Sequence, residues 1–282
     1  MFRIVFHKVF IIHDKLCRQG LFYFNVYGTG TISIIYEDYY KYDKYQKGDL
    51  RMYTGNYECL ELFVKPDEGK KGSVLLKNVK ESTTETKEPK HIYGNWIKFP
   101  VSRNTEYEIS TQDCTITFAY LSECENIMEN GICVLDTTDN YKEMNKEEFL
   151  HFIDTPYREQ YHFSPVVNWN NDPNGLCWFK GYYHLFYQMN PFGQEWNNMY
   201  WGHAASKDLV HWTHLPVVLE PQEEILDNLA IKGGAFSGSA LPMGDEVYFY
   251  LTRHIGPQDD GWDTIQYQTM TKSSDMIHFE PE

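Results

Sequence analysis

The chain has 282 residues, 42% of them hydrophobic and 16% aromatic, and its formal net charge is -15. This length and composition allow a sizeable core in one or two domains, which excludes a largely disordered chain. The acidic balance argues against a nucleic-acid partner, because neutralising phosphates requires Lys and Arg. Residues 156–282 are the more acidic part, with 6 Lys+Arg against 16 Asp+Glu, compared with 19 against 24 in residues 1–155.

The six cysteines form no CxxC pair and no metal-ligand spacing, so we interpret them as unpaired thiols in a reducing compartment. Near the N-terminus the longest apolar run, Val9–Ile12, is too short for a signal-peptide core. No stretch approaches the ~20 apolar residues of a membrane span. We therefore expect a cytoplasmic protein without a membrane partner and without a metal or other cofactor.

Residues 20–121 alternate short apolar runs with turn-rich or charged pieces, a pattern typical of a small all-β sandwich. The predicted strands are 21–27, 31–36, 59–64, 73–77, 96–101 and 115–121. Residues 145–153 predict a short helix, and we place a domain boundary around 150–157. The first domain, 1–150, is then an accessory domain, either a structural companion or a carbohydrate-binding module. Its single tryptophan, Trp96, favours the structural role.

The second region, residues 157–282, repeats itself. The segment 181–187 aligns with 244–250, and the segment 206–212 aligns with 273–279. Two copies of a hairpin followed by a polar turn indicate propeller blades, with chance similarity between hairpins as the alternative. Because propellers have ~4 to 8 blades, we expect this domain to be truncated in the present chain.

The same region is rich in aromatic and amide side chains. Between Tyr161 and His203, 13 of 43 residues are Phe, Tyr or Trp. Aromatic rings can cover the C–H faces of a sugar while amides and hydroxyls bind its hydroxyl groups. An aromatic sheet core is the alternative explanation.

One stretch, NWNNDPNG at 168–175, holds a single carboxylate among turn-forming residues. Pro173 pushes Asp172 toward an extended conformation. Asn174-Gly175 predicts a tight turn into a strand at 176–179, which would place Asp172 at the strand entrance. An ordinary turn with no catalytic role remains the alternative.

Five segments in order resemble glycoside hydrolase family 32, which contains the invertases, inulinases and levanases. These segments are YREQYHFSP, WNNDPNG, YHLFYQMNP, WNNMYWGHA with SKDLVHW, and FSGSA, all within residues 157–282. The resemblance implies a five-bladed β-propeller and a retaining mechanism with two carboxyl groups. It implies that Asp172 is the nucleophile that attacks a terminal fructosyl unit of sucrose or a fructan.

The resemblance also assigns a sugar pocket to Asn171, Gln188, Trp196, Phe236 and Ser237. Trp169 and Asn170 flank the nucleophile, and we expect them to form part of the same wall.

The remaining motifs of the family are missing from the sequence. No Arg-Asp-Pro segment occurs, and the two Glu-Cys pairs, at 58–59 and 123–124, precede Asp172. We therefore expect these 282 residues to be a fragment that hydrolyses little sucrose by itself, because a general acid contributes ~10²- to 10⁴-fold in rate. A non-catalytic carbohydrate-binding protein or an inactive pseudoenzyme is the alternative. Hydrolysis and fructosyl transfer are not distinguished.

Overall fold

The computed structural model describes residues 22–26, 32–36, 50–135, 137, 162–257 and 264–282. The chain divides into two compact units, 1–47 and 48–282. In the first unit, β1 (Phe22–Val26) pairs antiparallel with β2 (Ile32–Tyr36). These two strands lie within the predicted strands 21–27 and 31–36. The predicted helix at 145–153 and the predicted domain boundary at 150–157 lie outside the described residues.

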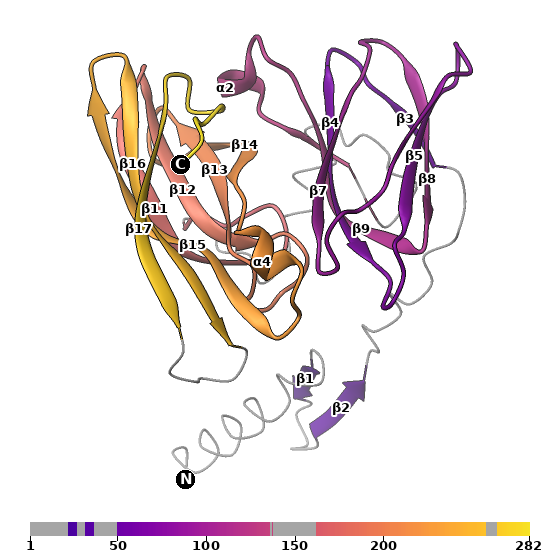
Figure 1. The fold of residues 1–282 in the computed structure, drawn as a ribbon, viewed down its shortest axis with the longest axis horizontal. Helices are drawn as coiled ribbons and strands as arrows, with labels where there is room; N and C mark the ends of the chain where they lie inside the picture. Colours follow the sequence, from indigo (N-terminus) through magenta and orange to yellow (C-terminus); the bar gives the residue numbers. More distant parts are fainter. Residues whose placement is uncertain (1–21, 27–31, 37–49, 136, 138–161, 258–263) are drawn as a thin grey trace. The chain divides into compact units, whose positions relative to one another are not determined.

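The first part of the second unit is a sandwich of two four-stranded antiparallel sheets (Figure 1). One sheet has the order β3 (Leu50–Tyr53), β8 (Glu106–Gln112), β5 (Ser73–Asn78) and β6 (Thr84–Lys87). The other has the order β10 (Cys133–Val134), β9 (Cys114–Ser122), β4 (Cys59–Pro66) and β7 (Asn95–Pro100). A sandwich is therefore present, as predicted, but it begins at residue 50: the predicted strands 21–27 and 31–36 form the separate sheet β1–β2 in place of joining it.

Strand β4 is buried on both faces, which explains its nearly continuous apolar sequence. Leu60 and Leu62 pack into the core between the two sandwich sheets. Phe63 points the other way, into a second core that it shares with Leu185 and Tyr200 of the second region. The sandwich and the second region are thus joined by a common hydrophobic core.

A buried carboxylate reinforces this junction. Glu61 accepts hydrogen bonds from the Trp96 indole (2.8 Å) and the Tyr120 hydroxyl (2.9 Å). The same hydroxyl of Tyr120 accepts a hydrogen bond from the backbone N–H of Val217, in the second region, at 3.2 Å. Phe63 stacks on Trp96, and the Lys98 ammonium lies 3.8 Å from the centroid of the Trp96 indole ring. Trp96 therefore helps to pack the sandwich against the second region.

The second region contains two antiparallel sheets that resemble adjacent propeller blades (Figure 1). The first sheet is β11 (Trp169–Phe179), β12 (Tyr182–Asn190), β13 (Tyr200–Ser206) and β14 (Trp212–Leu219). The second is β15 (Ile231–Met243), β16 (Glu246–Pro257) and β17 (Ile265–Ser273). Two short helices, α2 (Ile127–Asn130) and α4 (Glu223–Leu226), lie in connections. The all-β class is therefore confirmed, and no described helix is long and apolar enough to cross a membrane.

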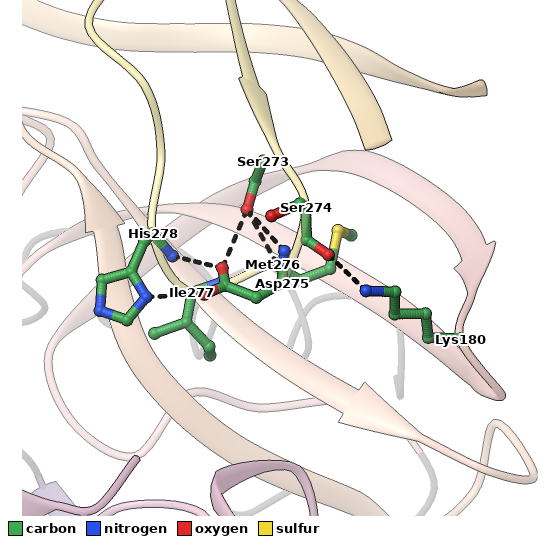
Figure 2. A network of polar contacts seen from close by, with 7 residues as sticks. All are labelled: Lys180, Ser273, Ser274, Asp275, Met276, Ile277 and His278. Carbon is green, nitrogen blue, oxygen red and sulfur yellow. Dashed lines mark hydrogen bonds and ion pairs between the residues drawn. The ribbon is translucent and has the colours of Figure 1, made fainter. Parts of the chain in front are cut away.

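The two copies of the internal repeat form the same hydrogen-bonded turn in the structure. In the second copy, Asp275 Oδ1 accepts hydrogen bonds from the backbone N–H groups of Ile277 and His278, and its Oδ2 lies 2.7 Å from His278 Nδ1 (Figure 2). In the first copy, Asp208 makes the same bonds to Val210 and His211, also with an Oδ2–Nδ1 distance of 2.7 Å. Chance similarity between two hairpins does not reproduce such a network.

Candidate active site

The strand that carries Asp172 differs from the predicted turn-then-strand arrangement. Strand β11 runs through the whole motif, from Trp169 to Phe179, with register shifts between Asn170 and Pro173 and between Asn174 and Cys177. Asn174-Gly175 therefore does not form the predicted tight turn; the irregularity is a β-bulge. Pro173 is tolerated because β11 is an edge strand of its sheet.

Gly175 is required at the second bulge for two reasons. Its φ is +54°, and a Cβ atom there would lie 2.9 Å from the ring of Phe186. The backbone of β11 can thus approach β12 closely at this point. Asp172 lies at the first bulge with an exposed side chain, as a group that meets a substrate must be.

Three predicted site residues meet through hydrogen bonds. The Ser237 hydroxyl donates to Asp172 Oδ2 at 2.6 Å, and Gln188 Nε2 donates to Ser237 Oγ at 3.2 Å. Gln188 is 3% exposed, so it holds the serine from the interior of the sheet. In the part of the chain that the structure describes, no hydrogen bond reaches Asp172 Oδ1. One carboxylate oxygen is therefore held by Ser237, and the other has no hydrogen-bond partner among the described residues.

A second contact aligns the strands that carry these residues. Strand β15 has its own register shift, between Ala235 and Gly238, and the backbone N–H of Gly238 donates to Asn174 Oδ1 at 3.3 Å. Asn174 is 1% exposed. Sequence reasoning missed this role, because Asn174 was interpreted as a turn residue. Its place two residues after Asp172 was the available signal.

Trp196 and Phe236 form an aromatic wall, with ring centroids 6.2 Å apart and planes at 74°. The other neighbour of Phe236 is His254, whose ring stacks on it at 4.3 Å. Burial lowers the pKa of His254, which favours its neutral form. Gln266 Nε2 lies 2.9 Å from His254 Nδ1 and fixes the ring. His254 and Gln266 support the wall and were not predicted from the sequence.

The loop that presents Trp196 is tied down by asparagines. The Asn168 side chain donates to the carbonyl of Pro191 at 2.8 Å. Asn190 accepts from the backbone N–H of Phe192 and donates to the carbonyl of Glu195, both at 3.0 Å. The side-chain amides of Asn168 and Asn190 thus hold the loop that presents Trp196.

The remaining predicted pocket residues lie beside Asp172 in β11. Trp169 is half-buried, and Asn170 and Asn171 are exposed. Their side chains make no hydrogen bonds within the described residues. The structure places them around Asp172 in β11 without defining what they bind.

The two Glu-Cys pairs lie in the sandwich and are engaged there. Glu58 pairs with Arg103, with 3.0 Å between Glu58 Oε1 and Arg103 Nε, and Glu123 accepts a hydrogen bond from Asn130. Neither glutamate contacts Asp172, Ser237 or Gln188 in the described structure. Among the described residues no group of three or more His, Cys, Asp or Glu is placed to hold a metal ion.

The second region is similar to known proteins. The model of the glycosyl hydrolases family 32 N-terminal domain matches residues 162–282. A levanase from Bacillus subtilis is 56% identical over 90 residues, which are 32% of this chain and 12% of the levanase. A sucrose-6-phosphate hydrolase from Zymomonas mobilis is 40% identical over 142 residues, 50% of this chain and 27% of the relative.

Among solved structures, a glycoside hydrolase family 32 protein from Bifidobacterium adolescentis superposes with a TM-score of 0.76 at 33% identity. The match covers 83% of this chain and 39% of that protein, so it extends beyond residues 162–282 into the sandwich. The present chain therefore spans well under half the length of each of these three proteins.

Proposed function

Because residues 162–282 belong to the N-terminal domain of glycosyl hydrolase family 32, we propose that the protein cleaves terminal β-D-fructofuranosidic bonds in sucrose or fructans. In this proposal the chain supplies the nucleophile, Asp172, and one wall of the fructose pocket. The names of the levanase and the sucrose-6-phosphate hydrolase support this substrate class.

The observation that carries the proposal is the hydrogen bond from Ser237 to Asp172, itself supported by Gln188. It holds Oδ2 and leaves Oδ1 free to attack the anomeric carbon of the fructosyl unit. The new C–O bond forms as the glycosidic C–O bond breaks, which gives a covalent fructosyl ester and releases the other sugar. Water then attacks the anomeric carbon from the face that the first sugar left, opposite Asp172, and frees the carboxylate; two inversions retain the configuration.

Departure of the leaving sugar requires a proton, because a sugar alkoxide is a poor leaving group. A carboxylic acid supplies it in retaining glycosidases and later accepts a proton from the attacking water. We assign no residue of this chain to that role. Asn171, Trp169 and Asn170 are proposed to line the pocket beside the nucleophile, and Trp196 and Phe236 to cover the apolar face of the sugar.

The missing proton donor is also the reason to keep a second candidate function. A protein with the pocket but without the acid would bind fructosides without hydrolysing them. The two functions differ in whether Asp172 reacts with the anomeric carbon.

An activated substrate tests the nucleophile separately from the acid. A nitrophenyl β-fructofuranoside has a leaving group that departs without protonation, so Asp172 alone is expected to release nitrophenol. We expect Asp172→Asn to lower this rate about 10⁴-fold or more, the scale seen for hydrolase nucleophiles. Asp245→Asn, an exposed carboxylate outside the site, is the control. Binding of the fructoside without any release would support the non-catalytic alternative.

A further inference from the structure

The side chain of Phe236 is oriented by contacts outside its own strand. Phe236 lies within the register shift of β15, between Ala235 and Gly238, so the ladder of the sheet does not fix its side chain. The next residue along the chain, Ser237, donates the hydrogen bond to Asp172. The irregular segment therefore carries one ring of the aromatic wall directly beside the group that holds the carboxylate.

His254, in the neighbouring strand β16, provides the closest of these contacts. Its ring stacks on Phe236 with centroids 4.3 Å apart and planes at 11°, whereas Trp196 meets Phe236 edge to face. No ring contact joins Trp196 to His254 among the described residues. The imidazole therefore covers one face of Phe236, and a sugar can meet Phe236 only at its other face or at its edge.

The ring of His254 is itself held in place. It is 8% exposed, and Gln266 Nε2 lies 2.9 Å from its Nδ1. Two glycines leave the space that the ring occupies: a Cβ atom at Gly233 would lie 3.0 Å from His254 Cδ2, and one at Gly256 would lie 2.8 Å from Nε2. Because an amide nitrogen can only donate, Nδ1 accepts the bond from Gln266 and the proton of the neutral ring is on Nε2.

We propose that His254 is a positioning residue for substrate binding, which acts through Phe236. The inference rests on the proposed function, because Phe236 belongs to the proposed fructose pocket. His254 makes no hydrogen bond to Asp172 in the described part of the chain. Ser237 has its own support, the hydrogen bond from Gln188. Loss of the imidazole should therefore release Phe236 and weaken substrate binding, while the chemical step on Asp172 stays almost unchanged.

Initial rates on the nitrophenyl β-fructofuranoside test this role in turnover. We expect His254→Ala to raise KM about three- to tenfold, the scale of one aromatic pair, and to change kcat about twofold or less. His254→Phe should restore KM to within about twofold of the wild type, because it keeps a flat ring on Phe236. Gln266→Met, which removes only the hydrogen bond to Nδ1, should raise KM by less than His254→Ala does.

The matched control is His278→Ala, which removes an exposed histidine that follows β17, outside the site. It should change neither KM nor kcat. An unchanged KM in His254→Ala, a loss confined to kcat, or a failure of His254→Phe to restore KM would overturn the inference while leaving the fructosidase function in place.

A measurement on Phe236 itself requires no substrate and separates the inference from the proposed function. With 4-fluorophenylalanine in place of Phe236, the fluorine NMR spectrum of the folded chain should show a single signal. His254→Ala should split or broaden this signal, because the ring then samples several orientations, and His278→Ala should not. A single signal of wild-type width in His254→Ala contradicts the inference; absence of fructoside cleavage together with the split or broadened signal contradicts only the proposed function.

Discussion

The two sheets of residues 162–282 have the same arrangement of strands and turns, but they contribute different chemical groups to the candidate site. In both sheets the third strand is followed by the same kind of turn. Ser206 and Asp208 form it after β13, and Ser273 and Asp275 form it after β17. Their first strands diverge. Strand β11 presents a carboxylate at a bulge, whereas β15 presents a hydroxyl and a backbone N–H at its bulge. The repeat preserves packing and turns, and the chemistry lies where the copies differ.

The shared part of the design is clearest in the core between the sheets. Phe186 and Phe249 occupy equivalent positions in the two copies, and both are fully buried. Their rings contact each other edge to face, with centroids 5.1 Å apart. The interface between the sheets is therefore built from the same residue of each copy.

The largest expected effect comes from breaking this contact. Phe186→Ala and Phe249→Ala should each lower the free energy of unfolding by about 3–5 kcal/mol, because each leaves a cavity in a closed core. Denaturant titration measures the loss. Tyr250→Ala, at a 44% exposed neighbour of Phe249, should cost far less. A cost for Phe249→Ala as small as that for Tyr250→Ala would show that the sheets do not share a core.

A second difference between the sheets is a buried histidine pair found only in the first. His184 Nδ1 lies 3.0 Å from His203 Nε2, and His184 Nε2 lies 3.3 Å from the carbonyl of Phe179. His184 therefore donates to the carbonyl and accepts from His203. In the second copy, Val247 aligns with His184, and Thr271 lies opposite Phe249 as His203 lies opposite Phe186.

This pair predicts acid sensitivity. Burial lowers the pKa of His184 to about 4 and that of His203 well below its usual value. The unfolded chain takes up protons near pH 6.5, so the stability from neutral histidines is present above that pH and is lost as the pH falls toward 4. The double variant His184→Val, His203→Thr, which copies the second sheet, should flatten this dependence. An unchanged pH profile of the free energy of unfolding in the double variant would exclude the pair as its source.

The smallest effect is expected at the repeated turns. Asp208→Asn and Asp275→Asn each remove a carboxylate that pairs with a histidine and accepts two backbone N–H groups, so both should lower Tm modestly. The two losses should be similar, because the bonding is the same. Differential scanning calorimetry measures them, with Asp245→Asn as the control. A large loss from only one variant would mean that the turns are not equivalent.

The sequence predicted those parts of the fold that depend on local patterns. The sandwich strands were recognised where apolar residues are continuous, as in β4, and the propeller repeat was recognised from its turn residues. Strand β8 was missed because it carries acidic residues. Glu108 pairs there with Arg51 and Lys77 of neighbouring strands, contacts that no local pattern reveals.

The predicted tight turn at Asn174-Gly175 was wrong for a similar reason. Pairing of Pro173 with Tyr187 and of Asn174 with Phe186 keeps the segment in a strand, and this register depends on residues more than ten positions away. At the site, the family resemblance supplied the members of the pocket. It did not supply the bond between Ser237 and Asp172, 65 residues apart, or the stacking of His254 on Phe236.

The account depends most on Asp172 as a nucleophile. Mass spectrometry of the acid-quenched reaction with a nitrophenyl β-fructofuranoside tests this role directly. We expect one fructosyl unit attached to the peptide that contains Asp172, and no such adduct in Asp172→Asn. An adduct on another residue, or turnover that inverts the anomeric configuration without any adduct, would contradict the account.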